Sequence, residues 1–141
     1  MTMTTDTLVP YKPRRLLGAF LWLAQGVLAF FLLWGAYMKL GMPLEEAAQM
    51  APWVAALPGL ALFTGVVDLL GGLGIVLPAL LRIQPRLSVL AAVGIIALQV
   101  LAMGFHLMRG EAMVLPMNLV LLALAAFVLW CRTRAMPFAA T

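Results

Sequence analysis

The sequence predicts an all-α membrane protein, a bundle of four antiparallel transmembrane helices. Of its 141 residues, 65% are hydrophobic and only 10% are charged, and the mean hydropathy is +1.10. Globular chains are roughly 45–50% apolar and about 25% charged, so this composition fits lipid rather than water. The chain also contains four apolar runs, each close to the ~20 residues that a helix needs to cross ~30 Å of hydrocarbon.

The first apolar run follows Arg14 and Arg15 and covers about residues 16–38. It is too long for the hydrophobic region of a secretory signal peptide, and a helix satisfies backbone groups that lipid cannot. Residues 1–13 are rich in threonine, contain two prolines and have no apolar periodicity. We therefore expect a disordered or surface-lying tail there, followed by a membrane domain over residues 14–132.

Three further runs predict helices over about 59–80, 87–108 and 113–131. The connections after the second and third helices are short, so consecutive helices should be antiparallel neighbours. Residues 133–141 are expected to form a C-terminal tail.

The longest connection, GMPLEEAAQMAPWVAALPG at 41–59, predicts a short interfacial segment between the first two helices. Pro43 is suited to start a short helix, with Glu45 and Glu46 in its first turn. Pro52 argues against one straight helix. Trp53, Val54 and Leu57 are expected to face lipid or the bundle, as in an interfacial segment. The segment is either a strap on the surface or a lid over the outer mouth of the bundle. The need of outer loops for interfacial anchors favours the strap.

The basic residues predict the orientation in the membrane. Seven lie on one side, against only Lys39 and Arg109 on the other: Lys12, Arg14, Arg15, Arg82, Arg86, Arg132 and Arg134. By the positive-inside rule, both termini should be cytoplasmic in a multi-pass protein of the cell's inner membrane. The basic residues sit in small groups beside apolar segments, which argues against a nucleic-acid surface despite the net charge of +4.

Five polar side chains interrupt the predicted helices at graded depths. Counted from the outer helix ends at ~1.5 Å per residue, His106 lies about 3 Å in and Asn118 about 8 Å. Asp68 and Gln99 both fall near ~14 Å, and Gln25 near ~20 Å. They form a predicted polar ladder that descends from the outer face to the midplane.

Asp68 is the most costly of these residues, because an acid at mid-bilayer costs about 2.5–3.5 kcal/mol. It must face protein, where it is either protonated and hydrogen-bonded, with Gln99 as first candidate, or ionised against Lys39. The ladder as a whole is open to two interpretations. It holds the polar head of a lipid-soluble ligand or a short proton path, or it ties helices together at about 0.6–2 kcal/mol per hydrogen bond.

Other chemistry has little support in the residues. Cys131 is the single cysteine, so dithiol exchange within the chain is excluded, and a small buried hydrophobe is expected. His106, the single histidine, and Met103 lie three residues apart on one helix and cannot take opposite axial faces of a haem. No His/Cys/Asp/Glu cluster suggests a metal site. We therefore expect no catalysis by this chain alone.

The glycines of GVVDLLGGLG, residues 65–74, predict close helix packing rather than a phosphate loop, because no strand precedes them and the segment lies in lipid. The expected packing positions are Gly65, Gly71, Gly72 and Gly74.

Four stretches of the chain resemble DoxX-type membrane proteins over about residues 17–132. They are GAYMKLG at 35–41, GVVDLLGGLGIVLP at 65–78, FHLMRGE at 105–111 and MNLVLLALAAFV at 117–128. The positions that match the family's polar signature are Lys39, Asp68, His106, Arg109 and Asn118. Asp68 stands where the family usually carries glutamate.

The resemblance implies a small four-helix membrane protein. Named members of the family include a subunit of a thiosulfate:quinone oxidoreductase. The resemblance favours a membrane subunit that binds a quinone head near Asp68, Gln99 and His106 for a partner redox enzyme. Two alternatives stay open. One is an assembly subunit that docks its glycine faces against another membrane subunit or a second copy, and the other is a carrier of a small hydrophobic molecule or proton.

Overall fold

The computed structural model describes residues 15–137 of the chain. The tail expected at 1–13 and the last part of that expected at 133–141 lie outside these residues. Within them the elements, in chain order, are α1 (Arg15–Leu40), α2 (Leu44–Met50), α3 (Trp53–Ala56), α4 (Pro58–Leu81), α5 (Arg86–Met108), the 3₁₀ turn η1 (Ala112–Val114), α6 (Leu115–Trp130) and the π-helical turn η2 (Cys131–Ala135).

The predicted all-α architecture with four membrane spans is confirmed. Helices α1, α4 and α5, and the continuous stretch Ala112–Ala135 around α6, are each long and apolar enough to cross a membrane. Their ends lie within a few residues of the predicted ones. The fourth span is built from three consecutive helical pieces, η1, α6 and η2.

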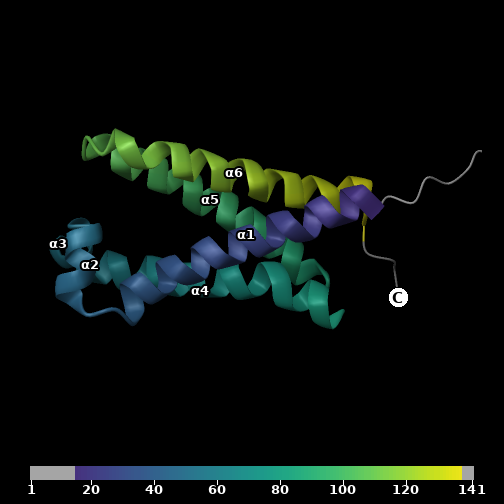
Figure 1. The fold of residues 1–141 in the computed structure, drawn as a ribbon, viewed down its shortest axis with the longest axis horizontal. Coiled ribbons are helices and arrows are strands. Elements are labelled where there is room, and N and C mark those ends of the chain that lie inside the picture. Colours follow the sequence, from purple (N-terminus) through teal and green to yellow (C-terminus); the bar gives the residue numbers. More distant parts are fainter. Residues whose placement is uncertain (1–14, 138–141) are drawn as a thin grey trace, which may run out of the picture.

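The four long helices form a closed ring. Helix α1 packs against α4 and α6, and α5 packs against the same two helices from the other side (Figure 1). We call one end the capped end, because α2 and α3 lie there beside the turn between α5 and η1. The opposite end is called the arginine end, after Arg15, Arg82, Arg86, Arg132 and Arg134.

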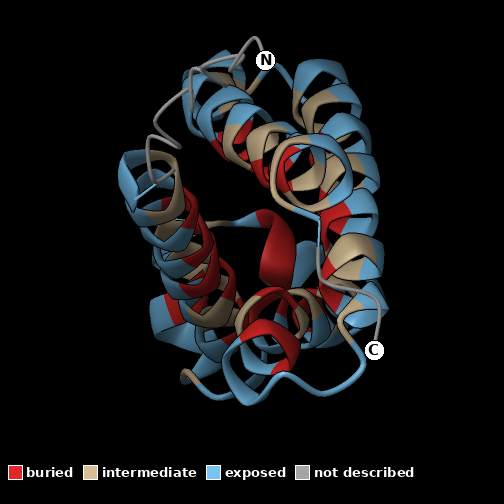
Figure 2. Ribbon diagram, turned by 90° about the vertical axis from the view of Figure 1, so that its right-hand side faces the viewer, coloured by how far each residue is buried: buried red, intermediate tan, exposed pale blue. Residues whose placement is uncertain are grey.

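Buried residues lie on the helix faces that point into the ring (Figure 2). Among the most deeply buried large side chains of this core are Leu28, Ile75, Ile95 and Val128, one from each long helix. Many large apolar side chains of the same helices are instead exposed on the outside. That is the distribution expected of a bundle whose surrounding medium is hydrocarbon.

Small residues bring α4 close to both of its neighbours. A methyl group at Gly65 would lie 2.8 Å from Leu40 of α1, and one at Gly72 would lie 2.9 Å from Leu33. On the other side, a methyl group at Gly71 would lie 3.3 Å from Ile95 of α5, and one at Gly74 would lie 3.1 Å from Ala91. All four glycines therefore face helices of this same chain.

The segment between α1 and α4 folds back onto the capped end. Pro43 precedes α2, which carries Glu45 and Glu46 in its first turn, and Pro52 precedes α3. Trp53 and Val54 are buried in a small cluster with Ala47 and Ala61. Because Trp53 points into the bundle, the segment has the character of a lid. The need of outer loops for interfacial anchors had instead favoured a strap on the surface.

Candidate functional site

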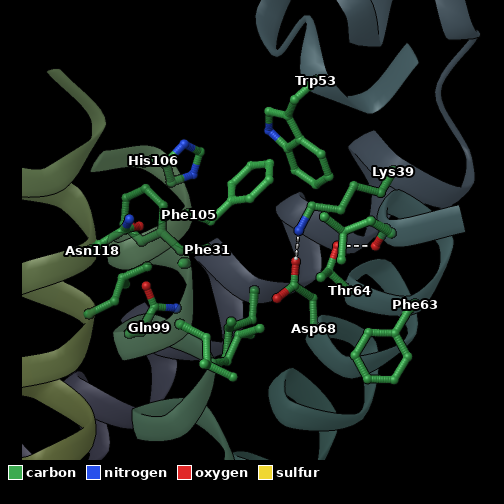
Figure 3. Close-up of a pocket in the computed structure, with 16 residues that line it drawn as sticks. Phe31, Lys39, Trp53, Phe63, Thr64, Asp68, Gln99, Phe105, His106 and Asn118 are labelled. Carbon is green, nitrogen blue, oxygen red and sulfur yellow. Dashed lines mark hydrogen bonds and ion pairs between the residues drawn. The ribbon is translucent and has the colours of Figure 1, made fainter. Parts of the chain in front are cut away.

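A pocket of about 280 Å³ lies inside the capped end of the bundle (Figure 3). Five of the seven polar residues singled out in the sequence line it: Lys39, Asp68, Gln99, His106 and Asn118. Each of the four long helices contributes at least one of these residues. Gln25 and Arg109 do not line the pocket.

One wall carries an ion pair. Lys39 Nζ donates to Asp68 Oδ2 at 2.6 Å, and only 12% and 7% of the two side chains are exposed. Of the two arrangements considered for Asp68, the cation partner is therefore the one present, and Gln99 is not its partner. Gly35 of α1 makes room for the carboxylate, because a methyl group there would lie 2.7 Å from Oδ2.

Trp53 roofs the pocket at the capped end. Its ring lies edge-on to Phe105 with the ring centroids 5.5 Å apart, and Lys39 Nζ lies 5.7 Å from the indole centroid. A desolvated cation–π contact of this kind adds about 2 kcal/mol. The Trp53 side chain of α3 therefore both covers the pocket and holds the Lys39 ammonium group in place (Figure 3).

The opposite wall carries two side-chain amides whose hydrogen bonding is incomplete. Gln99 is 4% exposed and Asn118 is 8% exposed. Among the described residues, neither Gln99 Oε1 nor Asn118 Nδ2 has a hydrogen-bond partner. Each such buried group costs about 1–3 kcal/mol. The pocket therefore presents hydrogen-bonding capacity that residues 15–137 leave unused.

The pocket opens sideways between α4 and α5. Leu60 and Phe63 of α4 and Leu101 of α5 line it and are themselves exposed on the outer surface. Thr64 also lines it, but its hydroxyl donates to the main-chain carbonyl of Leu60 at 2.9 Å rather than to Asp68. Access is thus from the surface that hydrocarbon would surround.

His106 belongs to a second network that extends away from the pocket. Its Nδ1 lies 2.6 Å from Glu111 Oε2, and Arg109 Nε donates to Glu111 Oε1 at 2.9 Å. The hydrogen bond with His106, and next that from Arg109, hold the pKa of the Glu111 carboxyl below its ordinary value. Arg109 therefore acts on the site through Glu111, which joins it to His106, and through Phe105, whose ring centroid lies 5.4 Å from the guanidinium carbon.

Gln25 lies in a separate place, nearer the arginine end. Its amide donates to the main-chain carbonyl of Ile75, and its Oε1 accepts from Arg132 at 2.5 Å. The Arg132 guanidinium also lies over the Trp22 ring at 5.6 Å. Gln25 thus ties α1 to α4 and η2, so the interhelical role is the one seen for this rung of the ladder.

Sequence reasoning missed Gly35 and Glu111. Both lie inside the quoted stretches GAYMKLG and FHLMRGE, but their roles depend on which residue each helix end places opposite them. The part of the chain that the structure describes contains no group of three or more His, Cys, Asp or Glu residues that could hold a metal ion.

Comparison with protein-family models matches residues 23–128 to a family described as DoxX-like. No curated protein and no solved structure matches the chain.

The ion pair predicts strongly non-additive mutations. Asp68→Leu or Lys39→Met should each lower the free energy of unfolding by about 3–5 kcal/mol, because each leaves a buried charge without its partner. The double variant Lys39→Met/Asp68→Leu should lose less than either single variant. A double-mutant cycle of unfolding in detergent measures this. Additive losses, or single losses below about 1 kcal/mol, would contradict a buried pair.

The Glu111 network predicts a loss of stability in acid. A carboxyl whose pKa is lowered by folding stabilises the protein above its ordinary pKa of 4.5, and the contribution disappears as the pH falls below that value. The difference in Tm between the wild type and Glu111→Gln should thus be present at neutral pH and shrink as the pH falls below 4.5. A difference that keeps growing below pH 4.5 would show that Glu111 is not held by His106 and Arg109.

Proposed function

Since the chain belongs to the DoxX-like family, we propose that it is a membrane subunit without catalysis of its own that binds the head of a quinone or a similar lipid-soluble ligand for a partner redox enzyme. The observation that carries the proposal is the pair of incompletely bonded amides, Gln99 and Asn118, opposite the Lys39–Asp68 pair. An interhelical tie would have used these groups within the bundle, as Gln25 does.

The residues present suit a quinone head. Its carbonyl oxygens accept hydrogen bonds, which the Asn118 amide and the Lys39 ammonium donate, and the reduced form adds hydroxyls that the oxygens of Gln99 and Asp68 accept. Phe31, Trp53 and Phe105 surround these polar groups with aromatic rings. The volume of about 280 Å³ is near the lower limit of small-molecule sites, ~300 Å³, and therefore suits a head group alone.

The redox chemistry would come from the ligand and the partner. A bound quinone supplies two-electron carrier chemistry, while this chain orients the head and keeps water from it beneath Trp53. The chain has one histidine and one cysteine, so we assign the electron donor or acceptor to another subunit. The assembly alternative keeps only part of its original basis, because Gly65 and Gly72 pack against α1, whereas Gly71 and Gly74 face α5 and also line a groove beside it.

The proposed setting is the inner membrane, with the arginine end in the cytoplasm. The two basic residues of the capped end both pair with carboxylates, Lys39 with Asp68 and Arg109 with Glu111. The positive-inside rule counts Lys and Arg rather than net charge, and the described residues place five arginines at the arginine end against these two basic residues, which supports this orientation. A fluorescent-protein fusion at the C-terminus should fluoresce, and a secreted-phosphatase fusion there should be inactive. The opposite pair of results would invert the orientation.

The ligand site predicts a trade between stability and binding. Replacing Gln99 or Asn118 by leucine removes a buried polar group that has no hydrogen-bond partner. The ligand-free protein should therefore keep or raise its Tm. The same variants should weaken binding of a benzoquinone by tenfold or more, measured as quenching of tryptophan fluorescence in lipid nanodiscs. Gln49→Leu, on the exposed face of α2, is the matched control and should leave binding unchanged.

Two results would count against the proposal. If wild-type protein does not bind the benzoquinone, the site is not a quinone site. If Gln99→Leu and Asn118→Leu lower the Tm by several degrees and leave binding unchanged, the amides are structural ties.

A further inference from the structure

We propose that an apolar groove between α4 and α5 holds the hydrocarbon tail of the ligand whose head occupies the polar pocket. The inference rests on the function proposed above and adds the shape of the ligand to it. It assigns a flat, hydrogen-bonding head with one flexible apolar chain, which lies along the outside of the bundle toward the arginine end.

The groove is a second hollow of about 550 Å³. It is lined by residues between Val67 and Pro78 of α4 and between Leu87 and Leu98 of α5, all of them Val, Leu, Ile, Ala, Gly or Pro. Leu70 and Leu90 on its edges are exposed, so it is open to the medium around the bundle. This hollow has the surface chemistry of a hydrocarbon chain.

The groove and the polar pocket meet at one residue. Leu98 of α5 lines both, one position before Gln99, whose amide belongs to the pocket. The groove lies between α4 and α5, and the pocket opens on that side at Phe63 and Leu101. A ligand whose head lies in the pocket can therefore extend its tail into the groove without exposing the tail to water. A third hollow, between α1 and α6, is also apolar but shares no lining residue with the pocket.

Small residues shape the groove. Gly71 and Gly74 of α4 approach Ile95 and Ala91 of α5 closely and form its floor. Gly94 of α5 lines it too, and a methyl group added there would meet nothing within 4 Å. From Leu87 to Leu98 the helix rises about 16 Å, which sets the length available to a chain.

The charges of the pocket favour such an amphiphile over a phospholipid. A phosphate head carries a negative charge that needs an uncompensated cation, whereas the charge of the Lys39 ammonium is already balanced by Asp68. A pocket of about 280 Å³ with two neutral amides instead suits a neutral head. Because lipid tails are as apolar as the groove, a tail gains packing rather than hydrophobic transfer. We therefore expect the groove to raise affinity several-fold and to select the shape of the chain.

Gly94→Leu is the test, because it fills the groove from open space. Gly104→Leu is the matched control, since Gly104 lies on the same helix, is exposed, has the same open space and lines neither hollow. The probes are a dimethoxy-methyl-benzoquinone without a side chain and the same head with a decyl chain. Binding to protein in nanodiscs is expressed per mole fraction of probe in the bilayer, so that partitioning does not enter the comparison.

Wild type and Gly104→Leu should bind the decyl compound several-fold more tightly than the tailless head. Gly94→Leu should bind both probes equally, at the affinity that wild type has for the tailless head, and Gly94→Ala should lie between. The tailless probe must be unaffected in all variants, which also shows that Gly94→Leu is folded.

Three outcomes would overturn the inference. If wild type binds both probes equally, or Gly94→Leu keeps the advantage of the decyl chain, the groove holds no tail while the head site stands. If the tailless head does not bind wild type at all, the proposed function itself fails. If Gly94→Leu instead dissociates a dimer or a co-purifying subunit and leaves the tail dependence intact, a protein helix occupies the groove.

Discussion

The ion pair between Lys39 and Asp68 is the interaction on which the capped end of this bundle depends. A lone carboxylate in hydrocarbon would be expelled or neutralised, whereas here it accepts a hydrogen bond of 2.6 Å from an ammonium group. The pair forms because Gly65 and Gly72 let α4 lie close to α1, and because Gly35 leaves space for the carboxylate. The α1–α4 contact, the pair and the roof over it form one unit.

With the two charges satisfied by each other, the other polar groups of the pocket stand out. Gln99 and Asn118 lie across the cavity from this pair. Each has one amide atom that forms no hydrogen bond with any described residue. The bundle loses stability by keeping them polar, since leucine would fill the same positions at no hydrogen-bonding cost. Functional sites are where such losses concentrate. The neutral, aromatic-lined space between the two walls is therefore where a ligand head gains most from binding.

The sequence was sufficient for the fold, because apolar runs of membrane length permit few other structures. It also placed Asp68 and Gln99 at similar depth from a constant helical rise, but depth does not specify which side chains touch. Asp68 pairs with Lys39 because Gly65 and Gly72 bring α4 close to α1, a contact between two helices that residue spacing on one helix does not contain. For the same reason the sequence left open whether Trp53 faces lipid or the bundle, since its inward direction depends on how α3 folds back.

The central claim, that the capped pocket holds the head of a lipid-soluble molecule, is tested most directly by native mass spectrometry of protein extracted gently from its own membrane. The account predicts a small apolar molecule bound at near one per chain in the wild type and absent from the doubly substituted Gln99→Leu/Asn118→Leu protein. A wild type that carries no such molecule, or a double variant that retains the same one, would contradict it.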